Sequence, residues 1–266
     1  MRFNRNILRS QFYYYRRWYR DRLRQAMSSS GPSAKLERNF VFLHIPKAGG
    51  SSTRDFFKRV FPAHYMYPEP KLGRFPEYAS LKVRPPKVFM SHLGYRFAED
   101  ANATKATLLR HPVERLLSLY SYSVNPGKRR ALIGGLPADM SLMEFLQSPL
   151  PAVQMNIDNA QCWQLAYGYS HRERRVFCKE QSAANILPLA LANLDHIEHL
   201  GVIEQFELFK TQILDCYGGT AVKNTRRVNV TEQRLQYSEL TDEERAAVDD
   251  SVRQDMVLYE SVLGRL

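Results

Sequence analysis

Short apolar runs and stretches of helical periodicity alternate along most of this chain. The run from Val41 to Ile45 has the length of a buried strand, and Ser51 to Val60 follows it with its apolar residues on one helical face. The same patterns predict strands at residues 87–92, 104–109 and 199–203, and helices at residues 112–123, 152–167 and 207–217.

Helix-start signals strengthen this interpretation. Pro112 suits the first turn of a helix, and Ser141 with Glu144 forms a capping box for a short one. Thr241 with Glu244 caps a last helix that continues past Val252 to Val262 as one apolar face. Strands alternating with helices indicate an α/β fold, with a parallel sheet and helices on both of its faces. Residues 68–86 contain five prolines and are expected to form a loop.

Composition limits the class of protein. The chain has 266 residues, of which 44% are hydrophobic, and it contains no run of 18 apolar residues, so no transmembrane helix is predicted. The N-terminus lacks the apolar core of a secretory signal. None of the cysteines Cys162, Cys178 and Cys216 lies in a CxxC pair, which argues against structural zinc and leaves one disulfide open.

The positive charge is concentrated at the N-terminus. Residues 1–26 hold eight arginines and one acid, Asp21, and so carry +7 of the net +11. Apolar residues recur there at helical spacing, which fits a basic helix lying on a membrane surface or a polyanion, and equally a solvated arm or a helix packed on the domain. Residues 28–33 are typical of a linker, so we expect an arm over residues 1–38 and one domain over residues 39–266.

The segment "HIPKAGGSS", residues 44–52, follows the first predicted strand and opens a helix. Backbone N–H groups and the helix dipole make such a turn a site for an anion, and adjacent glycines let the backbone approach it. The order differs from the Walker motif, in which the lysine follows the glycines. An ordinary strand-to-helix turn fits these residues too. The groups that would contact a phosphate or sulfate are Lys47, Gly49, Gly50, Ser51 and Ser52.

A second segment, "LLRHPVERLLSLYSYS" at residues 108–123, repeats the order of strand, turn and helix. Arg110 lies at the end of the strand, where α/β sheets bind ligands, and Ser118 lies about two turns into the helix. These residues suit a second phosphate. Taken alone, Arg110 is equally suited to a surface ion pair, and Ser118 could be a helix residue without a special role.

Together the two segments resemble sulfotransferases that use 3′-phosphoadenosine 5′-phosphosulfate (PAPS), above all the carbohydrate group that includes the heparan sulfate 2-O- and 6-O-sulfotransferases. Weaker similarities follow in order over residues 39–262: "DNAQCWQLAYG" (158–168), "NLDHIEHLGVIEQFELF" (193–209) and "RRVNVTEQR" (226–234). The N-terminus departs from the Golgi members, which carry a membrane anchor and a stem.

The resemblance implies a P-loop-like parallel sheet flanked by helices, the sulfotransferase fold, and an in-line transfer that needs no metal. Lys47 would lie near the bridging oxygen of PAPS, and Arg110 with Ser118 would hold its 3′-phosphate. The 5′-phosphosulfate would contact Lys47, Ala48, Gly49, Gly50, Ser51 and Ser52, and Asn229 would belong to a loop that closes over the nucleotide.

An acceptor hydroxyl needs a general base, and histidine is the usual one near neutral pH. His92, in "VFMSHLGYRF" (88–97), ends a predicted strand and resembles the strand-end histidine assigned as the base in several relatives. We expect His44 to be structural support and His111 to turn away. Basic loop residues suggest a cleft for a sulfated or uronate-bearing glycan, which Gln161 is expected to face, although scattered solvated charge fits as well. These basic residues are Arg74, Lys82, Arg84, Lys87, Arg96, Lys128, Arg129 and Arg130.

Two other functions fit parts of the sequence. A P-loop-type phosphotransferase would need ATP and magnesium, and the order of lysine and glycine argues against it. A non-enzymatic polyanion-binding protein would rest on residues 1–26, which lie outside the predicted domain, and nucleic acid is not an expected partner. A hydroxyl-bearing acceptor is the expected partner, and the resemblance implies that it is a glycan. The expected location is cytoplasmic or peripheral to a membrane, or the Golgi lumen if an anchor is missing from this chain.

Overall fold

A computed structural model describes residues 35–66, 87–99, 102–125, 136–137, 139–218 and 235–266. The basic segment 1–26, the proline-rich stretch and the loop with Asn229 lie outside these residues. The boundary between arm and domain and the location of the protein therefore stay predictions. Within the described part, no helix combines the length and the apolar character needed to cross a membrane. The three cysteines lie within it and are free.

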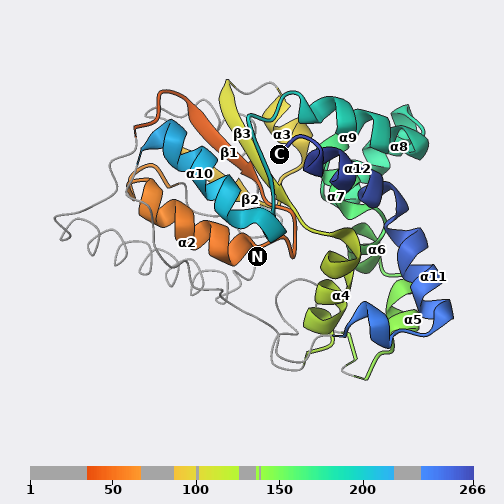
Figure 1. Ribbon diagram of the computed structural model, residues 1–266. Coiled ribbons are helices and arrows are strands. Elements are labelled where there is room, and N and C mark those ends of the chain that lie inside the picture. Colours follow the sequence, from red (N-terminus) through yellow and green to blue (C-terminus); the bar gives the residue numbers. More distant parts are fainter. Residues whose placement is uncertain (1–34, 67–86, 100–101, 126–135, 138, 219–234) are drawn as a thin grey trace, which may run out of the picture.

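Four strands in the described residues form one parallel sheet with the order β2-β1-β3-β4 (Figure 1). Leu43, at the end of the first strand, is in register with Ser91 on one side and with Thr107 on the other. The carboxyl ends of all four strands therefore meet along one edge, and the predicted α/β class is confirmed. The strands are β1 (Asn39–Leu43), β2 (Val88–Ser91), β3 (Ala103–Leu109) and β4 (His199–Val202).

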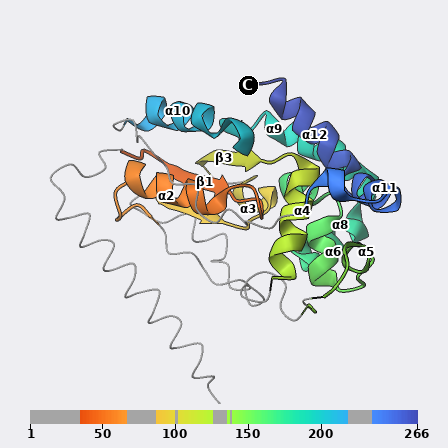
Figure 2. The ribbon, with the colours of Figure 1, turned by 60° about the horizontal axis from the view of Figure 1, so that its bottom comes forward.

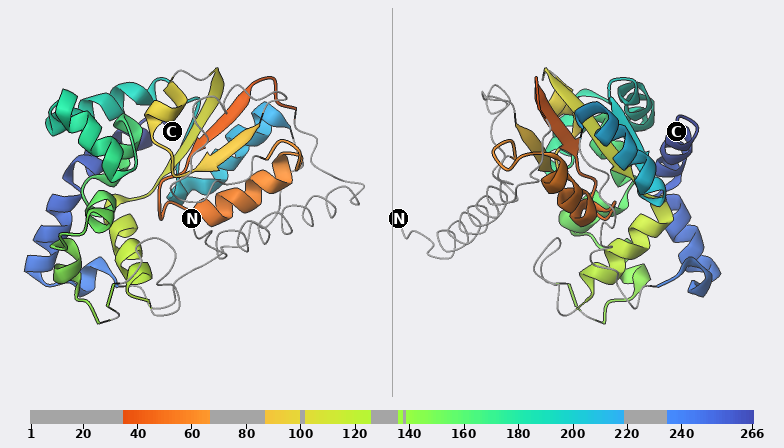
Figure 3. Two further views of the ribbon diagram at one scale, coloured as in Figure 1. Left: turned by 180° about the vertical axis from the view of Figure 1, so that it is seen from behind. Right: turned by 60° about the vertical axis from the view of Figure 1, so that its left-hand side comes forward.

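Alternate side chains of β1 point to opposite faces of the sheet. Phe40 and Phe42 pack against α2 (Gly50–Val60) and α10 (Phe206–Tyr217), which lie in front of the sheet in Figure 1. Val41 and Leu43 face the other helical layer. The left view of Figure 3 shows the molecule from behind, where helices of this second layer come forward. Its helices are α3 (Tyr95–Glu99), α7 (Ala160–Ala166), α8 (His171–Glu180), α9 (Ile186–Leu194) and α12 (Arg253–Leu263).

A third core lies beside the sheet. Leu116, Phe145 and Val248 are buried in it, and Figure 2 shows its helices grouped away from the strands. These helices are α4 (Pro112–Ser123), α5 (Leu142–Leu146), α6 (Pro151–Ile157) and α11 (Asp242–Ser251). The short 3₁₀ turns are η2 (Ala183–Asn185), η3 (Ile203–Gln205) and η4 (Tyr237–Glu239).

Most predicted elements are present, with shifts at their ends. The capping boxes at Ser141 and Thr241 are confirmed, and α4 spans the predicted residues. The helix predicted over residues 152–167 was wrong as one element, because it divides into α6 and α7 at Asn159, which adopts a left-handed φ of 39°. The last predicted helix likewise divides at Val252 into α11 and α12.

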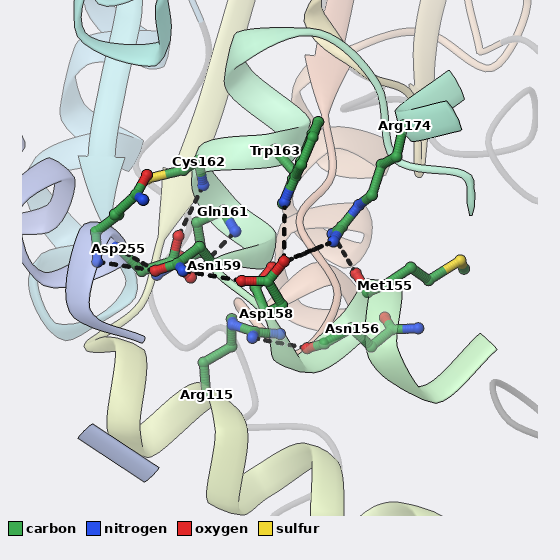
Figure 4. A network of polar contacts seen from close by, with 11 residues as sticks. Arg115, Met155, Asn156, Asp158, Asn159, Gln161, Cys162, Trp163, Arg174 and Asp255 are labelled. Carbon is green, nitrogen blue, oxygen red and sulfur yellow. Dashed lines mark hydrogen bonds and ion pairs between the residues drawn. The ribbon is translucent and has the colours of Figure 1, made fainter. Parts of the chain in front are cut away.

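Hydrogen bonds join the two places at which the predicted helices divide. The Asn159 side-chain oxygen accepts hydrogen bonds from the backbone N–H groups of Gln254 (2.8 Å) and Asp255 (3.2 Å), in the first turn of α12. In return, the Asp255 carboxylate accepts from the N–H groups of Gln161 (3.1 Å) and Cys162 (2.8 Å), in the first turn of α7 (Figure 4). Each helix thus supplies the cap that the other lacks. We call Asn159 and Asp255 the reciprocal cap.

Candidate functional site

Polar side chains follow each strand at the carboxyl edge of the sheet. His92 comes directly after β2, His44 after β1 and Arg110 after β3, while Glu204 lies two residues past β4. Ligands of open α/β sheets bind outside this edge. The neighbouring order of β2, β1 and β3 places the two histidines beside each other and brings Arg110 to the other side of the turn after β1.

The turn after β1 needs its glycines. Gly49 has a φ of 75°, and a Cβ atom on it would lie 2.2 Å from the Ile203 side chain. A Cβ atom on Gly50 would lie 1.7 Å from Nε2 of His44. Lys47 has a φ of 69°, a left-handed conformation that costs a non-glycine residue about 1–2 kcal/mol. The turn is therefore tight, and the His44 ring packs against its second glycine.

The amino end of α2 suits an anion. Gly49 is its N-cap residue and has no side chain to cap this end, and no first-turn residue is acidic. Ser51 and Ser52 lie in this first turn, exposed and partly exposed respectively, while Ala48 is buried. The partial positive charge at the start of a helix favours a negative ligand here.

The two predicted phosphate segments meet. Nη1 of Arg110 donates a hydrogen bond to the backbone oxygen of Lys47 over 3.1 Å, and its guanidinium also lies 3.7 Å from the Glu114 carboxylate. The Lys47 ammonium lies over the ring of Tyr122, 4.0 Å from its centre, and thus reaches α4. Ser118 is buried on α4 one turn before Tyr122. Lys47 and Arg110 therefore share one surface of the molecule.

Gln161 does not face a cleft, contrary to the prediction from the sequence. Its side chain is fully buried. It accepts a hydrogen bond from the backbone N–H of Arg110 (3.1 Å) and donates one to the backbone oxygen of the same residue (3.0 Å). The amide satisfies both backbone groups at the point where β3 has ended and α4 has not begun. Gln161 therefore fixes the turn that carries Arg110.

His92 lies between two rings. The His44 ring stacks on one side of it with 4.3 Å between centres, and the Tyr169 ring on the other with 5.4 Å. Nδ1 of His92 lies 2.8 Å from the backbone oxygen of His44. Because a carbonyl oxygen only accepts, Nδ1 carries the proton of this bond, and the neutral imidazole keeps its lone pair on Nε2.

His44 joins this histidine to the turn after β1, because its ring also packs against Gly50. Desolvation, with smaller effects of His92 and Arg54, lowers the pKa of His44 well below its usual value of 6.5. The ring is therefore neutral at neutral pH. The role predicted for His44, that of structural support, agrees with this packing.

His111 makes its contacts away from Arg110. Its backbone N–H donates to Glu204 (3.0 Å), and its ring packs edge-on against Tyr259 with 5.5 Å between centres. The Tyr259 hydroxyl donates to the same carboxylate (3.2 Å), and desolvation followed by Glu204 raises the pKa of Tyr259 to about 12. The C-terminal helix thereby supports the tip of β3.

Sequence reasoning missed several residues of this site, namely Tyr122, Gln164, Tyr169, Ile203 and Glu204. A usable signal existed for the glutamines: α7 reads AQCWQLA, and two amides on one face of an otherwise apolar helix predict buried hydrogen bonds. The partners of those amides are strand ends far away in the sequence, so the signal identifies the residues and leaves their role open.

Some predicted groups cannot be placed. Asn229 lies outside the described residues, as do most of the basic loop residues expected to line an acceptor cleft. Of those described, the Lys87 ammonium donates to the His64 backbone oxygen, and Arg96 lies over the Tyr167 ring at 4.7 Å. In the described part of the chain, no group of three or more His, Cys, Asp or Glu side chains is arranged to hold a metal ion.

Comparison with known proteins agrees with the arrangement of Lys47 and Arg110 at the carboxyl edge of the sheet. No curated protein matches the chain significantly. The family model described as "Sulfotransferase family" matches residues 35–260, which include all four strands and both segments that meet at Lys47 and Arg110. Most of the chain is covered by this match, and the chain belongs to the sulfotransferase family.

Proposed function

We propose that this protein transfers the sulfuryl group of PAPS to a hydroxyl of a carbohydrate acceptor. One observation carries the proposal: the Arg110 guanidinium donates to the Lys47 backbone, so cations suited to the two ends of PAPS lie on adjoining turns at the carboxyl edge of the sheet. Membership of the sulfotransferase family supports the class of reaction. The choice of PAPS and of a carbohydrate rests further on the resemblance of the segments at residues 44–52 and 108–123 to carbohydrate sulfotransferases.

In this proposal the first turn of α2 binds the 5′-phosphosulfate. The N–H groups of Gly49 and Gly50 and the hydroxyls of Ser51 and Ser52 are suited to its oxygens, and the helix dipole adds to their effect. Arg110 and Ser118 bind the 3′-phosphate, the group that distinguishes PAPS from ATP. Gln161 keeps Arg110 in position through its backbone.

The reaction is an in-line displacement at sulfur. The acceptor oxygen forms the new bond to sulfur, the bond from sulfur to the phosphate oxygen breaks, and its electron pair stays on adenosine 3′,5′-bisphosphate. Lys47 stabilises the charge that develops on this leaving oxygen. The acceptor proton goes to Nε2 of His92, the nitrogen left unprotonated by the bond from Nδ1 to His44.

Calorimetry tests the choice of nucleotide. We expect adenosine 3′,5′-bisphosphate to bind without metal and more tightly than ATP with magnesium, and Arg110→Ala to weaken the former selectively. Preference for ATP with magnesium would indicate a phosphotransferase instead, and binding of neither would contradict both.

Turnover tests the acceptor and the base. A panel of heparan sulfate, chondroitin sulfate and small alcohols, incubated with sulfur-labelled PAPS, should show label on a polysaccharide. His92→Ala should lower kcat by about 10²–10⁴-fold and leave nucleotide affinity unchanged, since a general base contributes to the chemical step. Label only on small alcohols would contradict the carbohydrate acceptor, and full turnover by His92→Ala would contradict the base.

A further inference from the structure

The side chain of Gln164 links the ends of two strands. Its amide nitrogen donates hydrogen bonds to the backbone oxygen of His44 (3.0 Å), just past β1, and to that of Leu93 (2.7 Å), just past β2. The side chain is fully buried in α7. His92 directly precedes Leu93 at the end of β2, so the amide holds the segment from which the imidazole projects.

The His44 backbone oxygen is a shared acceptor. It receives the bond from the Gln164 amide and is also 2.8 Å from Nδ1 of His92. The direction of this carbonyl decides whether Nδ1 of His92 finds an acceptor, and therefore which nitrogen of the ring carries the proton. Gln164 restrains that direction from a third element, α7.

Within the described part of the chain, only the amide nitrogen of Gln164 is paired, and this indicates what the side chain is for. Oε1 of Gln164 is buried and has no hydrogen-bond partner among the described residues. Burying an unpaired amide oxygen is unfavourable, whereas an apolar side chain of similar size would avoid that cost. The side chain is therefore suited to its two donated bonds, both of which end on the backbone around His92.

We propose that Gln164 is a positioning residue for the sulfuryl transfer: by fixing the His44 carbonyl, it holds His92 in the tautomer whose Nε2 receives the acceptor proton. This rests on the proposed role of His92 as general base. Gln164 touches neither substrate in this proposal. It acts through His44, and its loss should therefore affect the chemical step and not the binding of nucleotide.

The chain offers a matched control. The amide of Asn193, on α9, also donates two hydrogen bonds to backbone oxygens of α7, those of Leu165 (2.9 Å) and Ala166 (3.2 Å). Asn193→Leu thus removes the same kind of contact from the same helix without touching His44 or His92. Gln164→Met keeps the length of the side chain and removes the donors, and Gln164→Glu keeps its shape and places acceptors against both carbonyl groups.

The experiment compares these variants in the full chain. Turnover is measured with sulfur-labelled PAPS and heparan sulfate, nucleotide affinity by calorimetry with adenosine 3′,5′-bisphosphate, and the tautomer of His92 by heteronuclear NMR of its ring nitrogens. We expect both Gln164 variants to lower kcat by about 10–100-fold, the range for removing partners that orient histidines in metal sites. Their nucleotide affinity should be unchanged, and their His92 signals should shift from one tautomer towards a mixture.

The outcomes separate the inference from the function on which it rests. Normal kcat and an unchanged tautomer in Gln164→Met, with turnover lost in His92→Ala, would overturn the positioning role and leave the base in place. Equal losses in Gln164→Met and Asn193→Leu would also overturn it, because the effect would then be general damage to α7. Full turnover in His92→Ala would contradict the proposed base, and the positioning role with it. If Gln164→Met no longer binds the nucleotide, the positioning role is judged from Gln164→Glu by the same three measurements.

Discussion

Two polar clusters of this molecule differ in where their polar groups point: those of one reach the surface, and those of the other are buried and paired within the protein. The strand-tip site consists of Lys47, Gly49, Gly50 and Arg110, with backbone in left-handed conformations and cations that reach the surface. The reciprocal cap is buried and joins residues 96 positions apart, and each of its members satisfies backbone groups of the other helix. The first keeps polar groups suited to a ligand, while the second uses them within the protein. This difference separates residues proposed to bind a ligand from residues that hold the fold.

The comparison is tested most strongly by removing the carboxylate of the reciprocal cap. Asp255→Ala should lower the free energy of unfolding by about 3–5 kcal/mol, because it leaves two buried backbone N–H groups without their acceptor and removes a negative charge that interacts with the buried Arg115. Desolvation raises the pKa of Asp255 against the opposing effect of Arg115, so this carboxylate depends on its partners. Urea denaturation monitored by circular dichroism measures the change.

The control is Asp250→Ala. This acid is exposed and 3.6 Å from the Arg253 guanidinium, so its loss should cost less than about 1 kcal/mol. If Asp255→Ala is no more harmful than this control, the reciprocal cap does not stabilise the junction of α7 and α12.

The strand-tip site should respond in the opposite manner. Lys47→Gly should lower kcat by about 10²–10³-fold, the loss found when one group that stabilises developing negative charge is removed. Its stability should change by less than about 1 kcal/mol, because relief of the left-handed conformation offsets the lost contact with Tyr122 and the greater freedom of glycine in the unfolded chain.

Turnover with labelled PAPS and thermal unfolding of the same sample measure both quantities. If Lys47→Gly loses several kcal/mol of stability, Lys47 supports the fold. The proposed difference between the two clusters would then be wrong for Lys47.

The two clusters also differ in how far the sequence predicts them. The turn after β1 was predictable because its chemistry is local: Lys47, Gly49 and Gly50 are near neighbours in the chain. The capping boxes at Ser141 and Thr241 were predictable for the same reason, since a box spans four residues.

The reciprocal cap was not predictable, because Asn159 meets Gln254 only in the folded chain. Periodicity alone therefore continued a helix through both breaks. The α9 helix was missed since its apolar run has little periodicity. The α8 helix was missed although Ser170 and Glu173 form a capping box that the sequence displays. Gln161 was noticed, but its direction was predicted wrongly because its partner is the backbone of Arg110.

A smaller effect should separate the two parts that Asn159 plays. Asn159→Gly keeps the left-handed backbone and loses the acceptor for Gln254 and Asp255, which should cost about 0.5–2 kcal/mol. Asn159→Ala loses the acceptor as well and forces alanine into the same conformation, at about 1–2 kcal/mol more. Chemical denaturation of both variants gives the difference. Equal stability of the two would mean that the left-handed conformation is not retained when the cap is lost.

The smallest predicted effect concerns pH and His44, whose ring packs against Gly50 of the strand-tip site. The folded protein resists protonation of His44, so below pH 6.5 the unfolded chain binds a proton that the folded chain does not. Stability from this residue is therefore complete above pH 6.5 and falls as the pH is lowered, by at most about 1.4 kcal/mol per pH unit. His199, whose pKa is lowered chiefly by desolvation, contributes in the same direction. His44→Gln should make the dependence of unfolding free energy on pH less steep between pH 6.5 and the onset of carboxylate titration, and denaturation at a series of pH values would measure this. If the pH dependence of the unfolding free energy is the same in His44→Gln, the His44 ring takes up its proton in the folded protein. The ring that packs between Gly50 and His92 would then be charged at acidic pH.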